Sequence, residues 1–476
     1  MNDQNMTSTL TAGSRATRGS RALKAGIALA LLSSVATLAQ AQTAAPAADD
    51  SLTFHGITLY GLVDLGLQYQ TNGAPISDYF PAGSADIVQK NSRQSVFGVT
   101  PNNIAQSRIG LQGSEPIYGD ISGVFKLETF FNPQSGNISD ALKSVTLNNG
   151  RTAATSTTNI DSSVAGQLFQ QSYLGFSSPT LGTLTFGRQN TVLADGISKY
   201  DPNYASQAFS LIGLSGTTAG GGDTQDRRLD DSLKYVLNYN KTFHVAAQYK
   251  FNGSNGAANT AFEGSLGGEV AGLSVDAYYV KVRDAVSVSS LSAAQLTAAV
   301  TAGFSPDKAV AATISDNTTY ALLGNYKLNG EWKLFAGYEH IDYANPSQPL
   351  AVGFDDIGGY KLAVVNNAAF PNDKILQVYW AGVRWTAAPG LDLTLAYYGY
   401  HQNAYGTGAN AGCSTTQSGT CSGTLQDVSF DADYAFTKHF DGYVGAMYSG
   451  VKDGLAAGYD FHTTDITTTL GLRYKF

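Results

Sequence analysis

The C-terminal stretch 464–476 alternates between mostly apolar and polar side chains. With a period of two, one face carries Ile466, Thr468, Leu470, Leu472, Tyr474 and Phe476. The other face carries Asp465, Thr467, Thr469, Gly471, Arg473 and Lys475. Successive side chains of a β-strand point to opposite faces, so the pattern predicts a strand with one apolar and one wet face. Such a strand suits either a soluble sheet over a core or a membrane barrel whose apolar face meets lipid.

Similar segments recur along the chain, about sixteen in all, an even count as in bacterial membrane barrels. We predict strands over residues 54–70, 104–114, 119–131, 168–177, 183–189, 232–240, 242–251, 261–270, 273–283, 317–328, 331–343, 374–387, 391–402, 425–437, 440–450 and 464–476. Tight turns such as Asn329-Gly330 alternate with long connections near 71–103, 132–167, 190–230, 252–261, 284–316, 344–373, 403–424 and 451–463. A soluble sandwich gives no reason for this regularity. We therefore expect an all-β transmembrane antiparallel barrel with short periplasmic turns, long outer loops and both chain ends at the short-turn rim.

Residues 1–41 have the features of a secretory signal peptide. The basic n-region contains Arg15, Arg18, Arg21 and Lys24. An apolar segment over 25–38 and the small-residue site Ala39-Gln40-Ala41 follow. An N-terminal membrane anchor is the less favoured alternative, because the apolar segment is shorter than the roughly 20 residues that span a bilayer. We expect export by the general secretory route, a short segment over 42–53 and a barrel over 54–476.

The composition agrees with a barrel without proving one. The chain has 52 Gly, 27 Tyr and 22 Phe, and many aromatic residues suit the girdles at the two membrane interfaces. A large secreted sandwich or propeller would share this composition. The net charge of −8 disfavours nucleic acid as a partner.

The sequence offers little support for an enzyme. The six histidines are scattered without metal-ligand spacing, so we expect no metal. There is no G-x-S-x-G elbow and no P-loop, so we expect neither a catalytic role nor a cofactor. Catalytic residues distributed over a barrel wall remain an alternative that the sequence leaves open.

Several segments resemble the general diffusion porins of Gram-negative bacteria, especially those of β-proteobacteria. The stretches that carry the resemblance are 56–64, 107–115 with 124–128, 173–179 with 182–189, 228–235 and the aromatic C-terminus. The resemblance implies a homotrimer of 16-stranded barrels in the outer membrane, in contact with lipid and lipopolysaccharide. It also implies that the third outer loop, residues 190–230, folds into the pore. Phe476 would be the signal that the barrel assembly machinery reads on the last strand.

The resemblance assigns Arg108, Arg188 and Arg228 to a basic pore wall. The alternation supports Arg108, because Ile109 takes the lipid-facing parity and an arginine there would cost roughly 2–4 kcal/mol at mid-bilayer. Arg188 shares the parity of Phe186, so it needs a bulge, an inward-turned strand or a place at the rim. Arg228 could instead belong to a solvated loop base, with Arg227 beside it.

Charged residues of both signs are candidates for the constriction. Lys126 and Glu128 share one strand face, either as a luminal pair or as a screened surface pair. Asp195 and Asp201 lie early in the 190–230 loop and are the acidic groups that we expect to face Arg108. Their alternative role is to stabilise turns.

Two features of the outer loops complete the predictions. Cys413 and Cys421 are the two cysteines of an exported chain, so we expect a structural disulfide between them. The insert 284–316 has helical character. Ser292 could cap a helix that ends at Gly303, and Ser305-Pro306 could start a second one. The insert either covers the pore mouth or decorates the surface.

Together these patterns predict a passive trimeric porin through which ions and small hydrophilic solutes diffuse. A substrate-specific channel is the second interpretation, because the loops are long. A structural or adhesive barrel with a plugged lumen is the third.

Overall fold

The structure is a computed structural model. It describes residues 52–73, 94–138, 168–214, 227–240, 242–251, 260–289, 291, 293–303, 309–350, 361–367, 374–408, 412, 419–457 and 462–476. Residues Ser51–Phe476 form one compact unit. The predicted signal peptide over 1–41 lies outside the described residues.

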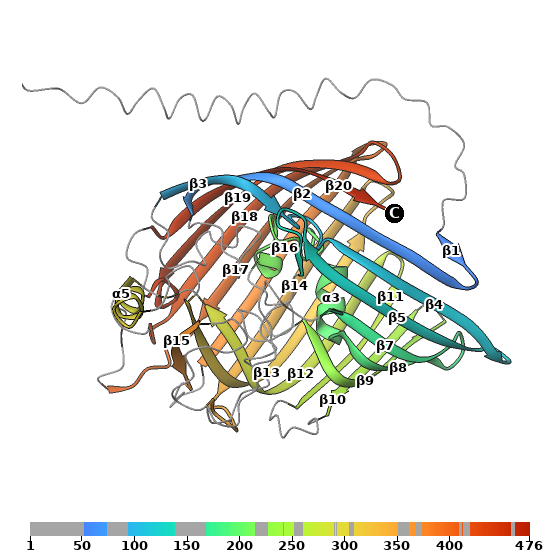
Figure 1. Ribbon diagram of the computed structural model, residues 1–476, viewed down its shortest axis with the longest axis horizontal. Coiled ribbons are helices and arrows are strands. Elements are labelled where there is room, and N and C mark those ends of the chain that lie inside the picture. The colour runs from blue at the N-terminus through green and yellow to red at the C-terminus, as the bar shows by residue number, and fades with distance from the viewer. Residues whose placement is uncertain are drawn as a thin grey trace, which may run out of the picture. The chain divides into compact units, whose positions relative to one another are not determined.

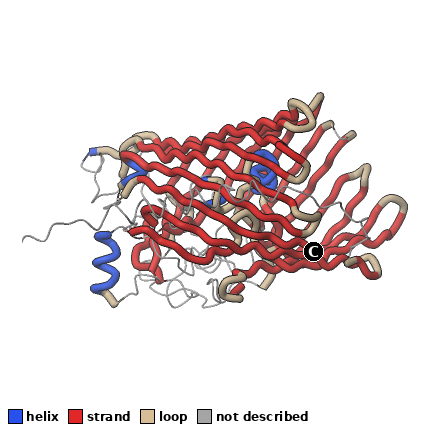
Figure 2. Tube along the Cα trace, turned by 90° about the horizontal axis from the view of Figure 1, so that it is seen from above, coloured by secondary structure: helices blue, strands red, loops and turns tan. Residues whose placement is uncertain are grey.

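Sixteen antiparallel strands close into a barrel, which confirms the predicted fold class (Figures 1 and 2). They are β2 (Ile57–Gly73), β4 (Arg108–Tyr118), β5 (Ile121–Asn132), β7 (Gln171–Ser178), β8 (Gly182–Asn190), β9 (Arg228–Tyr239), β10 (Phe243–Lys250), β11 (Ala261–Val270), β12 (Leu273–Ser289), β13 (Ala309–Lys327), β14 (Trp332–Ala344), β16 (Lys374–Ala388), β17 (Leu391–Gln402), β18 (Gly423–Ala435), β19 (Phe440–Asp453) and β20 (Thr464–Lys475). Each overlaps one predicted strand, because the alternation of side chains is a local property that each strand carries in full.

The ring closes where the first strand meets the last. β2 pairs with β20 from Leu62, opposite Lys475, to Gln70, opposite Thr467. Gly61 and Phe476 exchange two backbone hydrogen bonds of 2.9 and 3.0 Å. Below this point β1 (Thr53–Phe54) folds back onto the start of β2. Both ends of the barrel segment therefore lie at the short-turn rim.

Four short elements extend the strands or the loops. β3 (Gln94–Pro101) pairs with the later part of β2, whereas β4 pairs with its start. β6 (Asn137–Ile138) pairs with the end of β5. β15 (Lys361–Asn366) runs parallel to the start of β13, and the 3₁₀ helix η3 (Gly454–Ala456) follows β19.

The insert 284–316 contains strand at both ends and a helix between them. β12 and β13 continue past a bulge at Asp284, whose φ is 54°, and pair again from Ala285 to Ser289. α5 (Ala293–Thr301) matches the first predicted helix. Ser305 and Pro306, the predicted start of a second helix, lie outside the described residues, and β13 begins at Ala309. The β-branched residues Thr313 and Ile314 favour the extended pairing of this part of β13 with β12.

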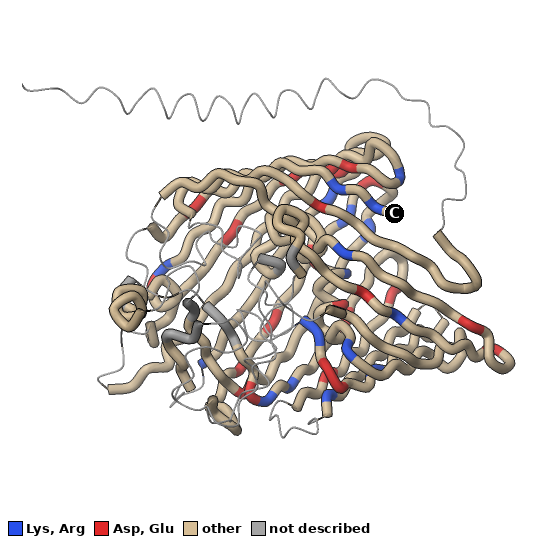
Figure 3. The backbone as a smooth tube through the Cα atoms, in the orientation of Figure 1, with Lys and Arg blue, Asp and Glu red and all other residues tan. Residues whose placement is uncertain are grey.

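The two faces of the barrel wall differ as the alternation predicts. On β13 the outward Leu322 is 56% exposed, whereas the inward Leu323 is fully buried. On β20 the outward Leu472 is 51% exposed and the inward Thr469 is 2% exposed. Charged residues of both signs are interspersed along the strands (Figure 3). Within the described ranges no helix is long and apolar enough to cross a bilayer.

The lipid-facing role of Leu322 gives a prediction about depth. Leu322 lies midway along the barrel part of β13, and Leu328, which is 55% exposed, follows the end of the same strand. We expect Leu322→Arg to lower the free energy of unfolding by roughly 2–4 kcal/mol and Leu328→Arg by about 0–1 kcal/mol, because the cost of a charge falls toward the interface. Denaturant titrations of protein refolded into vesicles measure both values. Equal costs at the two positions would contradict this orientation.

Candidate functional site

A loop after β8 enters the barrel and begins with a helix. α3 (Val192–Tyr200) starts at Thr191, whose side chain accepts a 3.0 Å hydrogen bond from the backbone N–H of Ala194. This is a standard N-cap and explains why the helix begins there. One face of α3, including Leu193 and Ile197, is fully buried against the inner wall. Figure 1 shows α3 inside the ring of strands.

Polar contacts fasten this loop to strands around the inner wall. The backbone N–H of Leu193 donates to Glu263 on β11 at 3.0 Å. The indole N–H of Trp380 on β16 donates to the carbonyl of Tyr200 at 3.0 Å. Farther along, the Asn203 amide donates to the Ser429 hydroxyl on β18 at 3.1 Å. The loop therefore follows the wall across several strands, and it includes α4 (Leu211–Leu214).

Asp201 anchors the loop and does not line the pore. Its side chain is fully buried. One carboxylate oxygen accepts the Tyr398 hydroxyl of β17 at 2.6 Å, and the other accepts the backbone N–H of Ala205 at 2.5 Å. Burial raises the pKa of this carboxyl above its usual range, against the lowering effect of these hydrogen bonds. The expectation that Asp201 faces the arginine wall is wrong, because the turn after α3 directs it into the barrel wall.

Asp195 stays accessible beside a lysine that sequence reasoning did not single out. The Asp195 carboxylate lies 2.5 Å from Nζ of Lys234 on β9, and its side chain is 51% exposed. It also accepts a 3.1 Å hydrogen bond from the Asn190 amide. Lys234 shares the parity of Ser232, which is buried on the inner face, so the alternation could have identified it.

Glu128 organises the charged residues of β4 and β5. Its side chain is 2% exposed, and its Oε2 lies 3.7 Å from Nε of Arg108 and 3.4 Å from Nζ of Lys126. The same carboxylate accepts hydrogen bonds from Tyr60 at 2.8 Å and Gln171 at 2.7 Å. The luminal interpretation of the Lys126–Glu128 pair fits this arrangement. Among the described residues, the ion-pair partner of Arg108 is Glu128 on β5. Asp223 and Asp226 of the loop lie outside the described residues, so the opposition of Arg108 to acidic groups of the loop stays a prediction.

A β-bulge turns Arg188 inward, as one of the three alternatives required. The pairing of β8 with β9 shifts register between Gly187 and Gln189, and Gly187 has a φ of 127°. A side chain at this glycine would lie 2.3 Å from the Ser172 carbonyl oxygen. Arg188 is 7% exposed, and its Nη1 lies 2.7 Å from Asp230. Glycine therefore allows the bulge that places this guanidinium inside.

Arg228 lies on the same inner surface as Arg108. Its guanidinium lies over the Phe130 ring, 4.4 Å from the ring centre. Phe130 is 6% exposed and is the register partner of Arg108. The neighbouring Arg227 donates to the Ser198 hydroxyl of α3 at 3.3 Å. The sequence left open which of these two arginines points toward the β5 side of the wall. In the structure Arg228 does so, and Arg227 contacts the loop.

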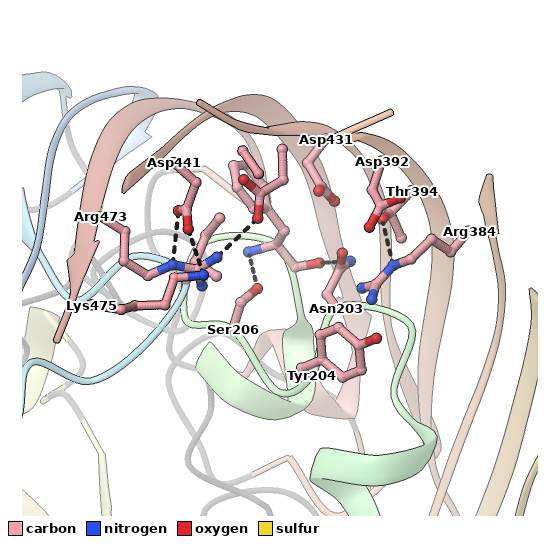
Figure 4. A pocket seen from close by; sticks show the side chains of 15 residues that line it. Asn203, Tyr204, Ser206, Arg384, Asp392, Thr394, Asp431, Asp441, Arg473 and Lys475 are labelled. Carbon is pink, nitrogen blue, oxygen red and sulfur yellow. Dashed lines mark hydrogen bonds and ion pairs between the residues drawn. The ribbon is translucent and has the colours of Figure 1, made fainter. Parts of the chain in front are cut away.

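A second charged group near the short-turn rim was not assigned from the sequence. Arg473 donates to Asp441 at 2.9 Å and to Asp433 at 3.0 Å, and Lys475 lies 2.6 Å from Asp441 (Figure 4). Arg384 donates to the Thr394 hydroxyl at 3.4 Å. The alternation of β20 puts Arg473 and Lys475 on its polar face, and this parity could have identified them as inward-facing.

The predicted disulfide, the C-terminal Phe476 and possible metal ligands are the remaining features of the prediction. Cys421 is disulfide-bonded, but Cys413 lies outside the described residues, so their pairing stays a prediction. Phe476 lies next to β20, and its ring centroid is 6.4 Å from that of Tyr474. In the part of the chain that the structure describes, no group of three or more His, Cys, Asp or Glu could hold a metal ion.

Comparison with known proteins identifies the family. A family model described as Gram-negative porin matches residues 28–454. The chain belongs to this family. The match, together with the closed barrel, places the protein in the outer membrane.

One relative and two solved structures agree with this assignment. An outer membrane porin protein of Bordetella pertussis is 26% identical over 200 residues, which are 42% of this chain. The chain spans 43% of the length of that relative. An anion-selective porin from Comamonas acidovorans has a TM-score of 0.56 at 15% identity, over 88% of this chain and 99% of the other. OmpT, an outer membrane protein of Vibrio cholerae, has a TM-score of 0.55 at 16% identity, over 90% and 100%. These structures show the shared fold.

The Asp201 anchor gives a prediction about the loop. Tyr398→Phe removes a hydroxyl that donates to a buried carboxylate, so we expect a loss of about 1–3 kcal/mol in the free energy of unfolding. Tyr338→Phe is the matched control, because Tyr338 is 42% exposed on the lipid face of β14. Denaturant titration measures stability, and protease cleavage within 190–230 reports on loop release. Equal effects of both substitutions would show that the Tyr398–Asp201 contact does not hold the loop.

Proposed function

We propose that the protein forms a water-filled channel through which ions and small hydrophilic solutes diffuse passively across the outer membrane. The observation that carries this proposal is the charged inner wall of the closed barrel. Arg108, Lys126 and Asp195 keep side-chain exposures of 35%, 19% and 51% while they are held by ion pairs. The family and the fold support a channel rather than an enzyme.

The constriction in this proposal lies between the loop with α3 and the wall formed by β4, β5, β8 and β9. Arg108, Arg188, Arg228 and Lys126 contribute basic groups, and Glu128 positions two of them. Asp195 contributes an accessible carboxylate from the loop. Charges that line a narrow wet passage determine which ions enter most easily. Polar solutes would also pass more readily than apolar ones, because a transverse field orders water and favours dipoles.

We further propose that three barrels assemble into a homotrimer surrounded by lipid and lipopolysaccharide. A trimer form of Vibrio cholerae OmpT has a TM-score of 0.54 at 14% identity to this chain, which supports this proposal by likeness of fold. The last strand would carry the signal for the barrel assembly machinery. Phe476 suits this role because it ends the strand that closes the ring.

Planar-bilayer recordings test the channel and the role of Arg108 together. We expect the wild-type protein to give stepwise, unsaturated conductance with simple salts. Arg108→Glu should shift the reversal potential in a salt gradient toward cation preference, because it replaces a pore-lining positive charge by a negative one.

Lys438→Glu is the matched control, since it makes the same change of charge in an exposed periplasmic turn. It should leave the reversal potential near the wild-type value. Silent bilayers from folded wild-type protein would reject the channel. A folded Arg108→Glu variant with wild-type selectivity would remove Arg108 from the constriction.

We also propose that the exported protein lacks residues 1–41 and contains a disulfide between Cys413 and Cys421. The support is the n-region, apolar segment and small-residue site at the N-terminus, and the oxidising compartment in which an outer-membrane protein folds. Mass mapping of outer-membrane protein without reductant should find an N-terminus at Gln42 and one cross-linked peptide pair. Free thiols at both cysteines, or a retained N-terminal segment, would reject the corresponding part.

A further inference from the structure

A pocket of about 290 Å³ lies between the loop turn at 203–209 and the inner wall of β16–β20. It lies near the short-turn rim, since Gly390 and Lys475 belong to its lining. Figure 4 shows the wall residues Asp431 and Asp392 on one side and Tyr204 on the other. The pocket is formed by other strands than those that carry the predicted basic wall.

Asp431 is the unusual residue of this pocket. It is 5% exposed, and its Oδ1 has no hydrogen-bond partner among the described residues. Its ladder neighbours are Thr394 on β17 and Gly445 on β19. Thr394 accepts a hydrogen bond from Arg384, no hydrogen bond joins its hydroxyl to Asp431 among the described residues, and Gly445 has no side chain. A buried carboxylate without a partner is costly, so the site is incomplete as it stands.

The charges around the pocket do not balance. Its lining contains the bases Arg384, Arg473 and Lys475 and the acids Asp392, Asp431, Asp433 and Asp441. Arg473 is held by Asp433 and Asp441, and Lys475 is held by Asp441. Arg384 donates to the Pro202 carbonyl and lies over the Tyr204 ring, 3.9 Å from its centre. The carboxylate of Asp431 is therefore left without a basic partner within ion-pair distance among the described residues.

We propose that this pocket binds a small organic cation of the primary-ammonium class, with Asp431 as the charge partner. An alkylammonium group brings three N–H donors, which suit Oδ1 of Asp431 and Oδ1 of Asp433, both without a hydrogen-bond partner among the described residues. Ile104, Phe209 and Ala435 also line the pocket and offer apolar contact to a short alkyl chain. The inference rests on the proposed channel, because the solute reaches the pocket through the lumen.

Calorimetric titration of n-butylammonium chloride into detergent-folded wild-type protein tests the site. We expect saturable binding of n-butylammonium and none of butyrate, which carries the same alkyl chain with the opposite charge. Asp431→Asn keeps the shape of the side chain and removes its charge, so binding should weaken by about tenfold or more. Asp342→Asn is the matched control and should bind like wild type, because Asp342 lies on the outer face of β14 and pairs with His340.

Asp392→Asn provides a second variant that does not depend on the folding of Asp431→Asn, and it should also weaken binding. Equal affinity of wild type and Asp431→Asn, or equal binding of butyrate, would overturn the proposal.

Bilayer recordings separate this inference from the channel itself. If the protein conducts but does not bind n-butylammonium, only the proposed ammonium site is rejected. A protein that binds n-butylammonium but stays silent in bilayers rejects the channel and leaves the pocket in place.

Discussion

Backbone pairing in hydrocarbon is the constraint on which this structure depends. Lipid offers no hydrogen bonds, so every N–H and C=O group of a spanning strand needs a partner within the protein. β2 meets this need with four elements, since it pairs with β3 and β4 on one edge and with β1 and β20 on the other. The chain thus brings its first and last strands together, and the barrel keeps no open edge.

Closure of the barrel also determines which side chains the inner face can contain. Side chains that point inward meet water, the opposite wall or the inserted loop. The inner face of β13–β17 is partly apolar, with Leu323, Ile341 and Val378 almost fully buried. These residues pack in the same cluster as Leu193 and Ile197 of α3. The apolar positions that interrupt a polar lumen face therefore mark the part of the wall that the loop covers, whereas Arg108 on β4 and Lys126 on β5 stay partly exposed.

The strands could be predicted from the sequence because alternation is local, and the lumen-facing orientation of Arg108 followed from the same parity. The details of the site depend on contacts between distant residues. Arg188 faces inward only because of the bulge at Gly187. Asp201 is fixed by Tyr398, which lies 197 residues away in the sequence, so no local pattern could show that it is an anchor. Glu128 was found as a charged neighbour of Lys126, but its contacts with Tyr60 and Gln171 come from pairing across strands.

We propose that the wall-anchored loop narrows an otherwise open barrel. Replacing residues 192–226 by a short Gly/Ser linker removes no residue of the sixteen strands or of the β2–β20 closure. Single-channel conductance of the refolded variant in planar bilayers is the most direct measurement. The account predicts steps clearly larger than those of wild type. A folded variant with the same conductance would contradict it, because the narrowest part of the pore would then lie elsewhere.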